Sequence, residues 1–201
     1  MTTRRAPARA EQLGLVDAGE PADVGYRCIA ADYPWPEVGG GRRGAQMHYE
    51  VQPVADAPWL IMQSPLWRPA VNAHLWMWAT ATHLSDAIFI MKALGFRYVT
   101  NAVWVKPSMG LGRYMRLRHE HLLLGARGRV PVGFDRRVDS VIEAPRTRRG
   151  KSVHSVKPDE AYCRIERVSP GPRAELFARD PRAGWDVWGN DPAVAPAEVA
   201  S

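Results

Sequence analysis

Cysteine is scarce in this sequence, and its two cysteines are far apart. Cys28 and Cys163 form no Cys-x-x-Cys motif and have no histidine at metal-ligand spacing, so we predict no zinc site and no other metal centre. Two cysteines in a chain of 201 residues fit a reducing compartment, although one disulfide between them is compatible with the pattern. The low cysteine content argues against a disulfide-rich secreted module.

Long hydrophobic runs are also lacking. The most apolar stretch, residues 75–91, is interrupted by His83 and Asp86. A membrane-spanning helix needs about 20 apolar residues, so we predict no membrane span. The Arg- and Ala-rich beginning of the chain is followed by no apolar signal-peptide core, and we therefore expect a cytoplasmic protein.

Lysine is scarce as well, in a chain that is otherwise basic. Of the 27 Lys and Arg residues only Lys92, Lys106, Lys151 and Lys157 are lysines, and the formal net charge is +6. A positive net charge favours an anionic binding partner. The composition therefore favours nucleic acid as that partner.

The two ends of the chain differ in composition from its middle. Residues 1–20 are polar and Ala-rich without a clear period, which predicts a flexible N-terminal lead-in. Residues 192–201 are rich in Pro and Ala, which predicts a disordered tail. The intervening residues 21–191 contain no repeat and no linker, so we predict one domain there.

Strand and helix patterns alternate through this domain. The stretches with strand character are 26–31, 74–79, 97–105, 121–126 and 174–178. Apolar residues recur at helical spacing over 84–94, just before Gly95, and a second helix is expected after Pro158. Strands separated by helices predict an α/β fold with a mostly parallel sheet flanked by helices.

The strand-ending loops are where chemistry is expected. In open α/β sheets, ligands bind beyond the carboxyl ends of the strands. The predicted strands end at the loops 32–37, 106–118 and 144–157. We therefore look for functional side chains in these three loops.

A short motif follows the first predicted strand and consists of Asp32, Tyr33, Pro34 and Trp35. The exocyclic amine of adenine is a poor nucleophile, because its lone pair is delocalised into the ring. A carboxylate and a backbone carbonyl stiffened by a following proline can accept hydrogen bonds from such an amine, and an aromatic side chain can stack on an extruded base. Short patterns also recur by chance, so the tetrapeptide alone favours an ordinary turn at the end of a strand.

Further blocks follow the tetrapeptide in a fixed order. They are Trp-Val-Lys-Pro at 104–107, Gly-Leu-Gly-Arg-Tyr at 110–114, His-Glu-His-Leu-Leu-Leu-Gly at 119–125, His-Ser-Val-Lys-Pro-Asp-Glu at 154–160, Glu-Leu-Phe-Ala-Arg at 175–179 and Gly-Trp-Asp-Val-Trp-Gly-Asn at 184–190. Together they resemble the adenine-N6 methyltransferase family typified by the catalytic subunit of the messenger-RNA adenosine methyltransferase, in its short bacterial and phage form. That family carries Asp-Pro-Pro-Trp at the catalytic motif.

The resemblance implies a Rossmann-like, S-adenosylmethionine-dependent methyltransferase that acts on the N6 amine of adenine. Asp32 and the Tyr33 carbonyl would accept hydrogen bonds from the amine, and Trp35 would stack on the ring. Tyr49 and Lys157 would lie at the target adenine. No metal is required for this chemistry.

The resemblance also implies a set of cofactor contacts. The residues that match the family's cofactor pocket are Asp32, Lys157, Leu176, Arg179, Asn190 and Asp191. Glu120 matches a buried acidic residue that helps to position the neighbouring loops.

The chain departs from the family pattern inside the catalytic motif. Tyr33 stands where the family has its first proline, so the carbonyl is kept while the ring that stiffens the turn is lost. We therefore expect Tyr33→Pro to keep or raise activity. The departure also leaves an alternative from another class, a catalytically inactive platform that binds nucleic acid for a partner subunit. The retained Asp32, Trp35, Lys157 and Asn190 favour the enzyme, since a platform needs none of them.

Arginines crowd the middle of the chain. Between positions 113 and 157 twelve basic residues face four acidic ones, a local charge of +8. Surface arginines are usually only solvated, but a cluster beside a base pocket favours phosphate contacts. The residues assigned to this role are Arg113, Arg116, Arg118, Arg146, Arg148 and Arg149. The cluster also disfavours a small adenine-containing molecule as the substrate.

We expect DNA ahead of RNA as the substrate, because the resemblance is closest to the short bacterial and phage members. A chain of 201 residues leaves no room for a separate recognition domain, so sequence specificity is expected to be low or borrowed from a partner. A homodimer and a heterodimer both fit this expectation.

Overall fold

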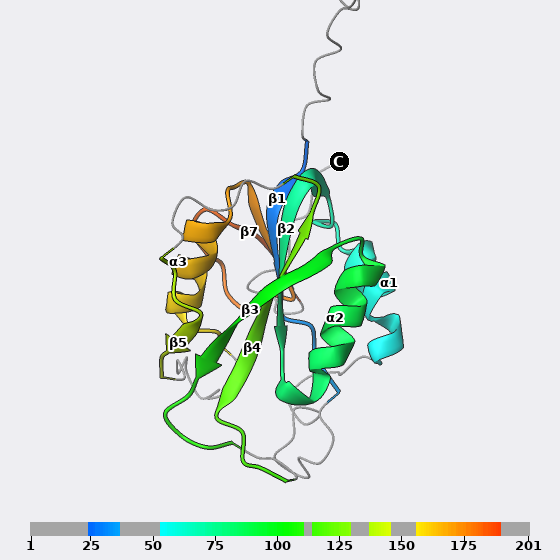
Figure 1. Ribbon diagram of the computed structural model, residues 1–201. Helices are drawn as coiled ribbons and strands as arrows, with labels where there is room; N and C mark the ends of the chain where they lie inside the picture. The colour runs from blue at the N-terminus through cyan, green and yellow to red at the C-terminus, as the bar shows by residue number, and fades with distance from the viewer. Residues whose placement is uncertain (1–23, 37–52, 111–113, 130–136, 146–155, 190–201) are drawn as a thin grey trace, which may run out of the picture.

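One sheet runs through the part of the chain that the structure, a computed structural model, describes: residues 24–36, 53–110, 114–129, 137–145 and 156–189 (Figure 1). Its strands are β1 (Tyr26–Ala31), β2 (Pro69–Ala79), β3 (Arg97–Val105), β4 (His119–Arg127), β5 (Val141–Glu143), β6 (Arg173–Leu176) and β7 (Asp186–Trp188). Their order across the sheet is β5-β3-β4-β2-β1-β6-β7. Among these described strands only β4 runs antiparallel to its neighbours, β2 and β3. The predicted α/β fold with a mostly parallel sheet is confirmed.

Helices cover both faces of this sheet (Figure 1). In the described residues they are α1 (Ala57–Gln63), α2 (Leu84–Ala93) and α3 (Asp159–Val168), with short 3-10 turns η4 (Val54–Asp56) and η5 (Ala81–His83). On one face, Ile61 of α1 and Ile90 of α2 share a core with Ile29 of β1. On the other face, Ile165 of α3 shares a second core with Trp104 of β3. No helix in the described residues has the length and apolar character needed to cross a membrane.

Five of the strands were predicted from the sequence. β1 and β3 have the predicted bounds, whereas β2 and β4 are longer than predicted. β6 ends earlier than predicted, because Phe177 adopts a φ of 60° and leaves the extended conformation. The helix expected before Gly95 is α2, and Gly95 has the positive φ, 82°, that commonly ends a helix. Pro158 is the N-cap of α3, close to the predicted first turn.

Three short elements were not predicted. α1 has seven residues, and β5 and β7 have three each. Segments of this length are too short to show a periodic pattern in the sequence. The two strands are instead defined by pairing, β5 with β3 and β7 with β6. The predicted flexible ends, 1–20 and 192–201, lie outside the described residues.

Candidate active site

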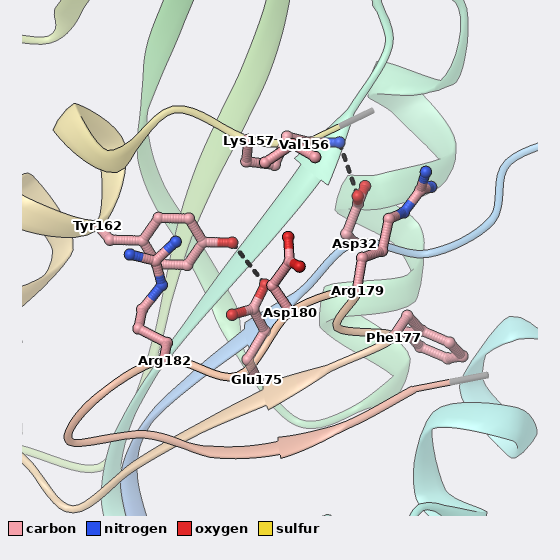
Figure 2. Close-up of a pocket in the computed structure, with 9 residues that line it drawn as sticks. All are labelled: Asp32, Val156, Lys157, Tyr162, Glu175, Phe177, Arg179, Asp180 and Arg182. Atoms are coloured by element: carbon pink, nitrogen blue, oxygen red, sulfur yellow. Dashed lines mark hydrogen bonds and ion pairs between the residues drawn. The ribbon is translucent and has the colours of Figure 1, made fainter. Parts of the chain in front are cut away.

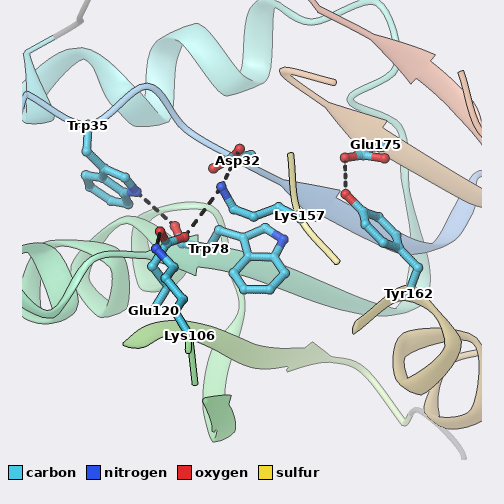
Figure 3. Close-up of polar contacts among 8 residues, drawn as sticks. All are labelled: Asp32, Trp35, Trp78, Lys106, Glu120, Lys157, Tyr162 and Glu175. Carbon is cyan, nitrogen blue, oxygen red and sulfur yellow. Dashed lines mark hydrogen bonds and ion pairs between the residues drawn. The ribbon is translucent and has the colours of Figure 1, made fainter. Parts of the chain in front are cut away.

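Asp32 and Lys157 meet at the carboxyl end of β1, although 125 positions separate them in the sequence (Figure 3). Lys157 Nζ donates a hydrogen bond of 2.7 Å to Asp32 Oδ2, and the two side chains are only 6% and 12% exposed. The Asp32 N–H donates to the Leu176 carbonyl at 3.2 Å, which extends the pairing of β1 with β6 to the motif. The fold therefore brings together two of the residues predicted for the site.

Two more charged side chains extend this pair. Glu120 Oε2 lies 3.6 Å from Lys157 Nζ, and Glu120 Oε1 accepts a hydrogen bond from Lys106 Nζ. Burial lowers the pKa of Lys157, but the Asp32 and Glu120 carboxylates outweigh burial and raise that pKa above its usual value. Burial raises the pKa of Glu120, but Lys157 and Lys106 outweigh burial and lower that pKa below its usual value. Lys157, which is buried, and Glu120, which is partly buried, therefore both stay ionised.

The side chain of Tyr33 anchors the motif in the core. It is 1% exposed, and its hydroxyl donates a hydrogen bond of 2.8 Å to the Pro53 carbonyl. Its ring makes edge contacts with Trp35 and Phe177, at centroid distances of 5.1 and 5.6 Å. Burial raises the pKa of Tyr33 to about 12, so the phenol is neutral near pH 7. These contacts hold the turn where the family uses a proline ring.

The backbone carbonyl of Tyr33 has a fixed direction. It accepts a hydrogen bond of 2.9 Å from the Trp35 N–H, which closes a three-residue turn around Pro34. A carbonyl oxygen has two lone pairs, so a second donor can still bind to it. The carbonyl therefore keeps a free lone pair, and its contact with an amine stays a prediction.

Trp35 is placed differently from its predicted role. Its side chain is 5% exposed, and its Nε1 donates a hydrogen bond of 2.9 Å to the Trp78 carbonyl. Its ring is stacked on His83, with centroids 5.1 Å apart and an interplanar angle of 12°. The structure corrects the prediction that Trp35 stacks on the adenine: the indole is a buried anchor of the motif, and His83 occupies one of its faces.

A pocket opens beside the Asp32–Lys157 pair (Figure 2). Its lining residues are Asp32, Val156, Lys157, Tyr162, Glu175, Phe177, Arg179, Asp180 and Arg182. Three of the predicted cofactor residues, Asp32, Lys157 and Arg179, are among them. Phe177 lines the pocket with a positive φ, a strained backbone conformation for a residue other than glycine. Such strain is typical of functional sites.

Leu176 was predicted to line the cofactor pocket, and the structure corrects this prediction. Its side chain is fully buried in the core on the α1 and α2 face. Its contribution to the site is the backbone carbonyl that holds the Asp32 N–H.

Tyr162, Glu175 and Arg182 line the pocket but were not predicted as site residues. Glu175 lies in β6 between Ala174 and Leu176, which are both fully buried. A carboxylate inside an otherwise apolar strand was the available sequence signal, because a buried charge is costly unless it has a partner.

Several predicted residues lie outside the described part of the chain. They are Tyr49, Asn190, Asp191, Arg113, Arg146, Arg148 and Arg149. Arg116 and Arg118 are described and exposed, in the loop between β3 and β4. Their Nε atoms donate to the Gly110 and Lys106 carbonyls, each at 3.2 Å. Arg118 therefore lies at the base of the loop, beside the residue that contacts Glu120.

The mostly parallel sheet, with helices on both faces and a charged pocket at the carboxyl ends of β1 and β6, is that of a Rossmann-like methyltransferase. The chain belongs to the MT-A70 family, whose model matches residues 26–191. Members of this family use S-adenosylmethionine as the methyl donor.

Curated relatives come from bacteria, plants and animals. The type II methyltransferase M.MunI of Mycoplasma sp is 34% identical over 126 residues, which are 60% of this chain and 52% of M.MunI. A putative N(6)-adenosine-methyltransferase MT-A70-like protein of Medicago truncatula is 31% identical over 162 residues, 68% of this chain and 25% of that protein. The human N(6)-adenosine-methyltransferase catalytic subunit METTL3 is 31% identical over 130 residues, 59% of this chain and 22% of METTL3. The chain thus spans about half the length of M.MunI and less of the other two.

Proposed function

We propose that this protein transfers a methyl group from S-adenosylmethionine to the exocyclic N6 amine of adenine in nucleic acid, with DNA preferred over RNA. The observation that carries the proposal is the buried Asp32–Lys157 pair at the mouth of a charged pocket. The names of the relatives METTL3 and the Medicago truncatula protein, both N(6)-adenosine-methyltransferases, support the same reaction. A homodimer or heterodimer and a cytoplasmic location stay predictions.

The pocket fits the proposed cofactor by its charges. It is lined by side chains of both signs, including Asp32, Lys157 and Arg179. S-adenosylmethionine carries a carboxylate, an ammonium and a sulfonium, so a pocket with cations and carboxylates matches it. We assign its carboxylate to Lys157 and Arg179, with Asn190 and Asp191 as further contacts from outside the described residues. When bound, S-adenosylmethionine supplies an electrophilic methyl group.

The catalytic motif acts on the adenine amine by hydrogen bonding. Asp32 and the Tyr33 carbonyl accept the amine hydrogens, which lets the nitrogen turn towards tetrahedral geometry. Lys157 holds the Asp32 carboxylate at 2.7 Å, so the acceptor is already oriented before the base arrives. Trp35 supports the turn from within the core, and Tyr49 is assigned to the enclosure of the base. Asp32 acts as a hydrogen-bond acceptor; the methyl transfer would leave S-adenosylhomocysteine as the second product, and the cationic nitrogen then loses its proton to solvent.

The basic loops are assigned to the phosphate backbone. Arg116 and Arg118 are exposed in the loop that follows Lys106, near the Glu120–Lys157 contact. Arg113 belongs to the same loop by sequence, and Arg146, Arg148 and Arg149 to the segment before Lys157. Contacts of this kind supply affinity without sequence specificity.

The alternative of an inactive platform rested on Tyr33 in place of proline. The contacts of Tyr33 with Pro53, Trp35 and Phe177 support a turn that is held without that proline. A platform does not need a carboxylate acceptor in the lining of a cofactor pocket, where Asp32 is held by Lys157. Both observations favour the enzyme.

Incubation of the full chain with isotopically labelled S-adenosylmethionine and DNA or RNA oligomers, followed by nucleoside mass spectrometry, tests the proposal. We expect labelled N6-methyladenine in both, with more in DNA. A parallel incubation with free adenosine serves as the comparison, and labelled product there with none in either oligomer would instead support a small-molecule enzyme. Binding of both oligomers without any transfer would overturn the enzymatic proposal in favour of the platform.

A further inference from the structure

The loop between β3 and β4 projects beyond the edge of the sheet at which β3 ends (Figure 1). The structure describes its two arms, residues 106–110 and 114–118. The Lys106 N–H donates to the Arg118 carbonyl at 2.6 Å, and the Gly110 N–H donates to the Leu117 carbonyl at 2.7 Å. These bonds continue the antiparallel pairing of β3 with β4, so the arms form a hairpin.

Three large apolar side chains of this hairpin lie in solvent. Tyr114 is fully exposed, Met115 is 76% exposed and Met109 is 54% exposed. Single exposed apolar residues are common on protein surfaces, but several of them on one projection are typical of a surface that binds a partner. The hairpin therefore carries apolar area that the rest of the described chain leaves uncovered.

The charges of the hairpin indicate the kind of partner. The two described arms contain Lys106, Arg116 and Arg118 and no acidic residue. Both arginines are exposed, and their Nε atoms donate to carbonyls of the facing arm at 3.2 Å, which tethers the guanidinium groups to the hairpin. Apolar side chains flanked by cations are typical of proteins that insert a wedge between DNA bases. Charge complementarity therefore favours nucleic acid over a protein partner.

The hairpin begins at the candidate active site. Lys106 Nζ donates to Glu120, whose other carboxylate oxygen lies 3.6 Å from Lys157 Nζ. Tyr114 lies four residues before Arg118, and an extended chain rises about 3.3 Å per residue, so their Cα atoms are at most about 13 Å apart. This distance is close to the width of the DNA major groove, about 12 Å. A duplex that delivers a base to Asp32 is therefore within reach of Tyr114.

The burial of Asp32 creates a need for such a contact. Its side chain is only 12% exposed, so an adenine must leave the base stack before its amine can approach the carboxylate. Extrusion breaks stacking and pairing and leaves a gap in the duplex. An aromatic or apolar side chain that enters the gap restores part of the lost stacking.

We propose that Tyr114 and Met115 form a wedge that enters double-stranded DNA and fills the space vacated by the extruded adenine, while Arg116 and Arg118 bind the neighbouring phosphates. This inference rests on the proposed function and adds to it that the enzyme acts on a base-paired adenine. Tyr114 supplies a ring that stacks on the neighbouring bases. Met115 supplies a flexible apolar side chain that adapts to the gap.

Methylation of one oligomer as a single strand and as a duplex tests the wedge, because only the duplex requires extrusion of a paired base. The full chain that carries both Tyr114→Ala and Met115→Ala is expected to lose about tenfold or more of its duplex rate, the size of a lost stacking contact. Its single-strand rate should change by no more than about threefold. A merely structural role would lower both rates alike.

Two variants serve as controls. Tyr114→Phe keeps the ring, so it should keep the duplex rate. Trp59→Ala removes an aromatic side chain that is 60% exposed on α1, and it should change neither rate. Loss of the duplex rate in Trp59→Ala as well would show that the effect is not specific to the hairpin.

Fluorescence of duplexes in which 2-aminopurine replaces single adenines measures unstacking without methyl transfer. The unaltered chain should raise the fluorescence at one or more of these positions at saturating protein. The double variant should lose most of this rise. No rise with the unaltered chain at any position would overturn the wedge.

The remaining outcomes separate the wedge from the proposed function. An unchanged duplex rate in the double variant overturns the wedge, and so does methylation of the single strand alone by the unaltered chain; both leave the proposed function standing. A double variant that loses both rates and changes its mass in sedimentation overturns the wedge in favour of a protein interface. Absence of methylation in both forms contradicts the proposed function, and the fluorescence then decides the wedge by itself.

Discussion

The hydroxyl of Tyr33 donates a hydrogen bond of 2.8 Å to the carbonyl of Pro53, which lies before the turn η4. This contact ties the catalytic motif to the segment that leads into α1. It lies at the one position of the motif where the chain departs from the family's Asp-Pro-Pro-Trp. The ring and hydroxyl of Tyr33 thus take over the stiffening of the turn that a proline provides elsewhere.

Tyr33→Pro is therefore expected to damage the protein, which reverses the expectation from the sequence alone. Loss of an aromatic ring that is 1% exposed leaves a cavity between Trp35 and Phe177. Large-to-small changes of this kind cost about 3 to 5 kcal/mol. Denaturant unfolding measures this loss, and the methylation rate should fall with it.

Tyr33→Phe is the matched control for that experiment. It keeps the ring and removes only the hydrogen bond to Pro53, so it should cost about 1 kcal/mol and leave most of the activity. A Tyr33→Pro variant as stable as the unaltered chain would show that the ring does not support the motif.

Lys157→Met should destabilise the fold through Asp32. The change keeps the length of the side chain and removes its charge, which leaves a carboxylate of 12% exposure without its partner at 2.7 Å. Removing one member of a buried pair costs about 3 kcal/mol or more. Denaturant unfolding of Lys157→Met, Asp32→Asn and the double variant measures the coupling. Additive losses would mean that the two side chains do not stabilise each other.

His74 should make stability depend on pH. Its Nδ1 lies 2.8 Å from Oγ of Ser169, the C-cap residue of α3, and burial, followed by the charges of Arg97 and Arg27, lowers its pKa to about 4. In the unfolded chain this histidine has an ordinary pKa near 6.5. Between pH 4 and pH 6.5 the imidazole is therefore protonated in the unfolded chain and neutral in the folded chain. The contribution of neutral His74 is therefore complete above pH 6.5 and is lost as the pH falls towards 4.

His74→Asn removes this titration and serves as the comparison. Between pH 7 and 4.5 the unaltered chain should lose on the order of 2 kcal/mol more unfolding free energy than His74→Asn does. Parallel stability curves for the two proteins would rule out the buried histidine as the cause.

Arg116→Ala combined with Arg118→Ala should weaken nucleic-acid binding about equally for unrelated sequences. Both side chains are exposed in the loop beside the site. Each lost phosphate contact is expected to reduce the slope of log affinity against log salt by about 0.9. Lys92→Ala, an exposed cation on α2, is the matched control and should leave the slope unchanged. A changed sequence preference with an unchanged slope would place the two arginines at bases and not at phosphates.

The four long strands β1 to β4 and helix α2 could be predicted because they are long enough to show a pattern. The site was harder to predict, because its contacts join residues that only the folded sheet brings together. Asp32 and Lys157 were both expected at the site, but their direct pairing depends on the position of α3 beside β1 and β6. Glu175 was missed although a carboxylate inside an apolar strand was a signal, and Tyr162 was missed because a hydrogen bond between a strand and a helix leaves no local pattern.

Trp35 shows the limit of a motif-based interpretation. An aromatic residue beside a catalytic carboxylate suggests stacking on the base. The ring is instead stacked on His83, the last residue of the turn η5, which follows β2 in the chain. Long-range packing of this kind cannot be inferred from the tetrapeptide.

The comparison of methylation rate with nucleic-acid affinity in Asp32→Ala tests the central claim most directly. Both assays are made on protein shown to be folded, because the change removes one partner of Lys157 and leaves Glu120 at 3.6 Å from it, and Glu143→Ala, an exposed acid at the end of β5, controls for lost charge. Interactions made in the transition state affect the rate and not the ground-state affinity. We predict that adenine methylation is abolished, while affinity changes by no more than about threefold, less than 1 kcal/mol. An Asp32→Ala protein that methylates adenine at the full rate would contradict the proposed mechanism.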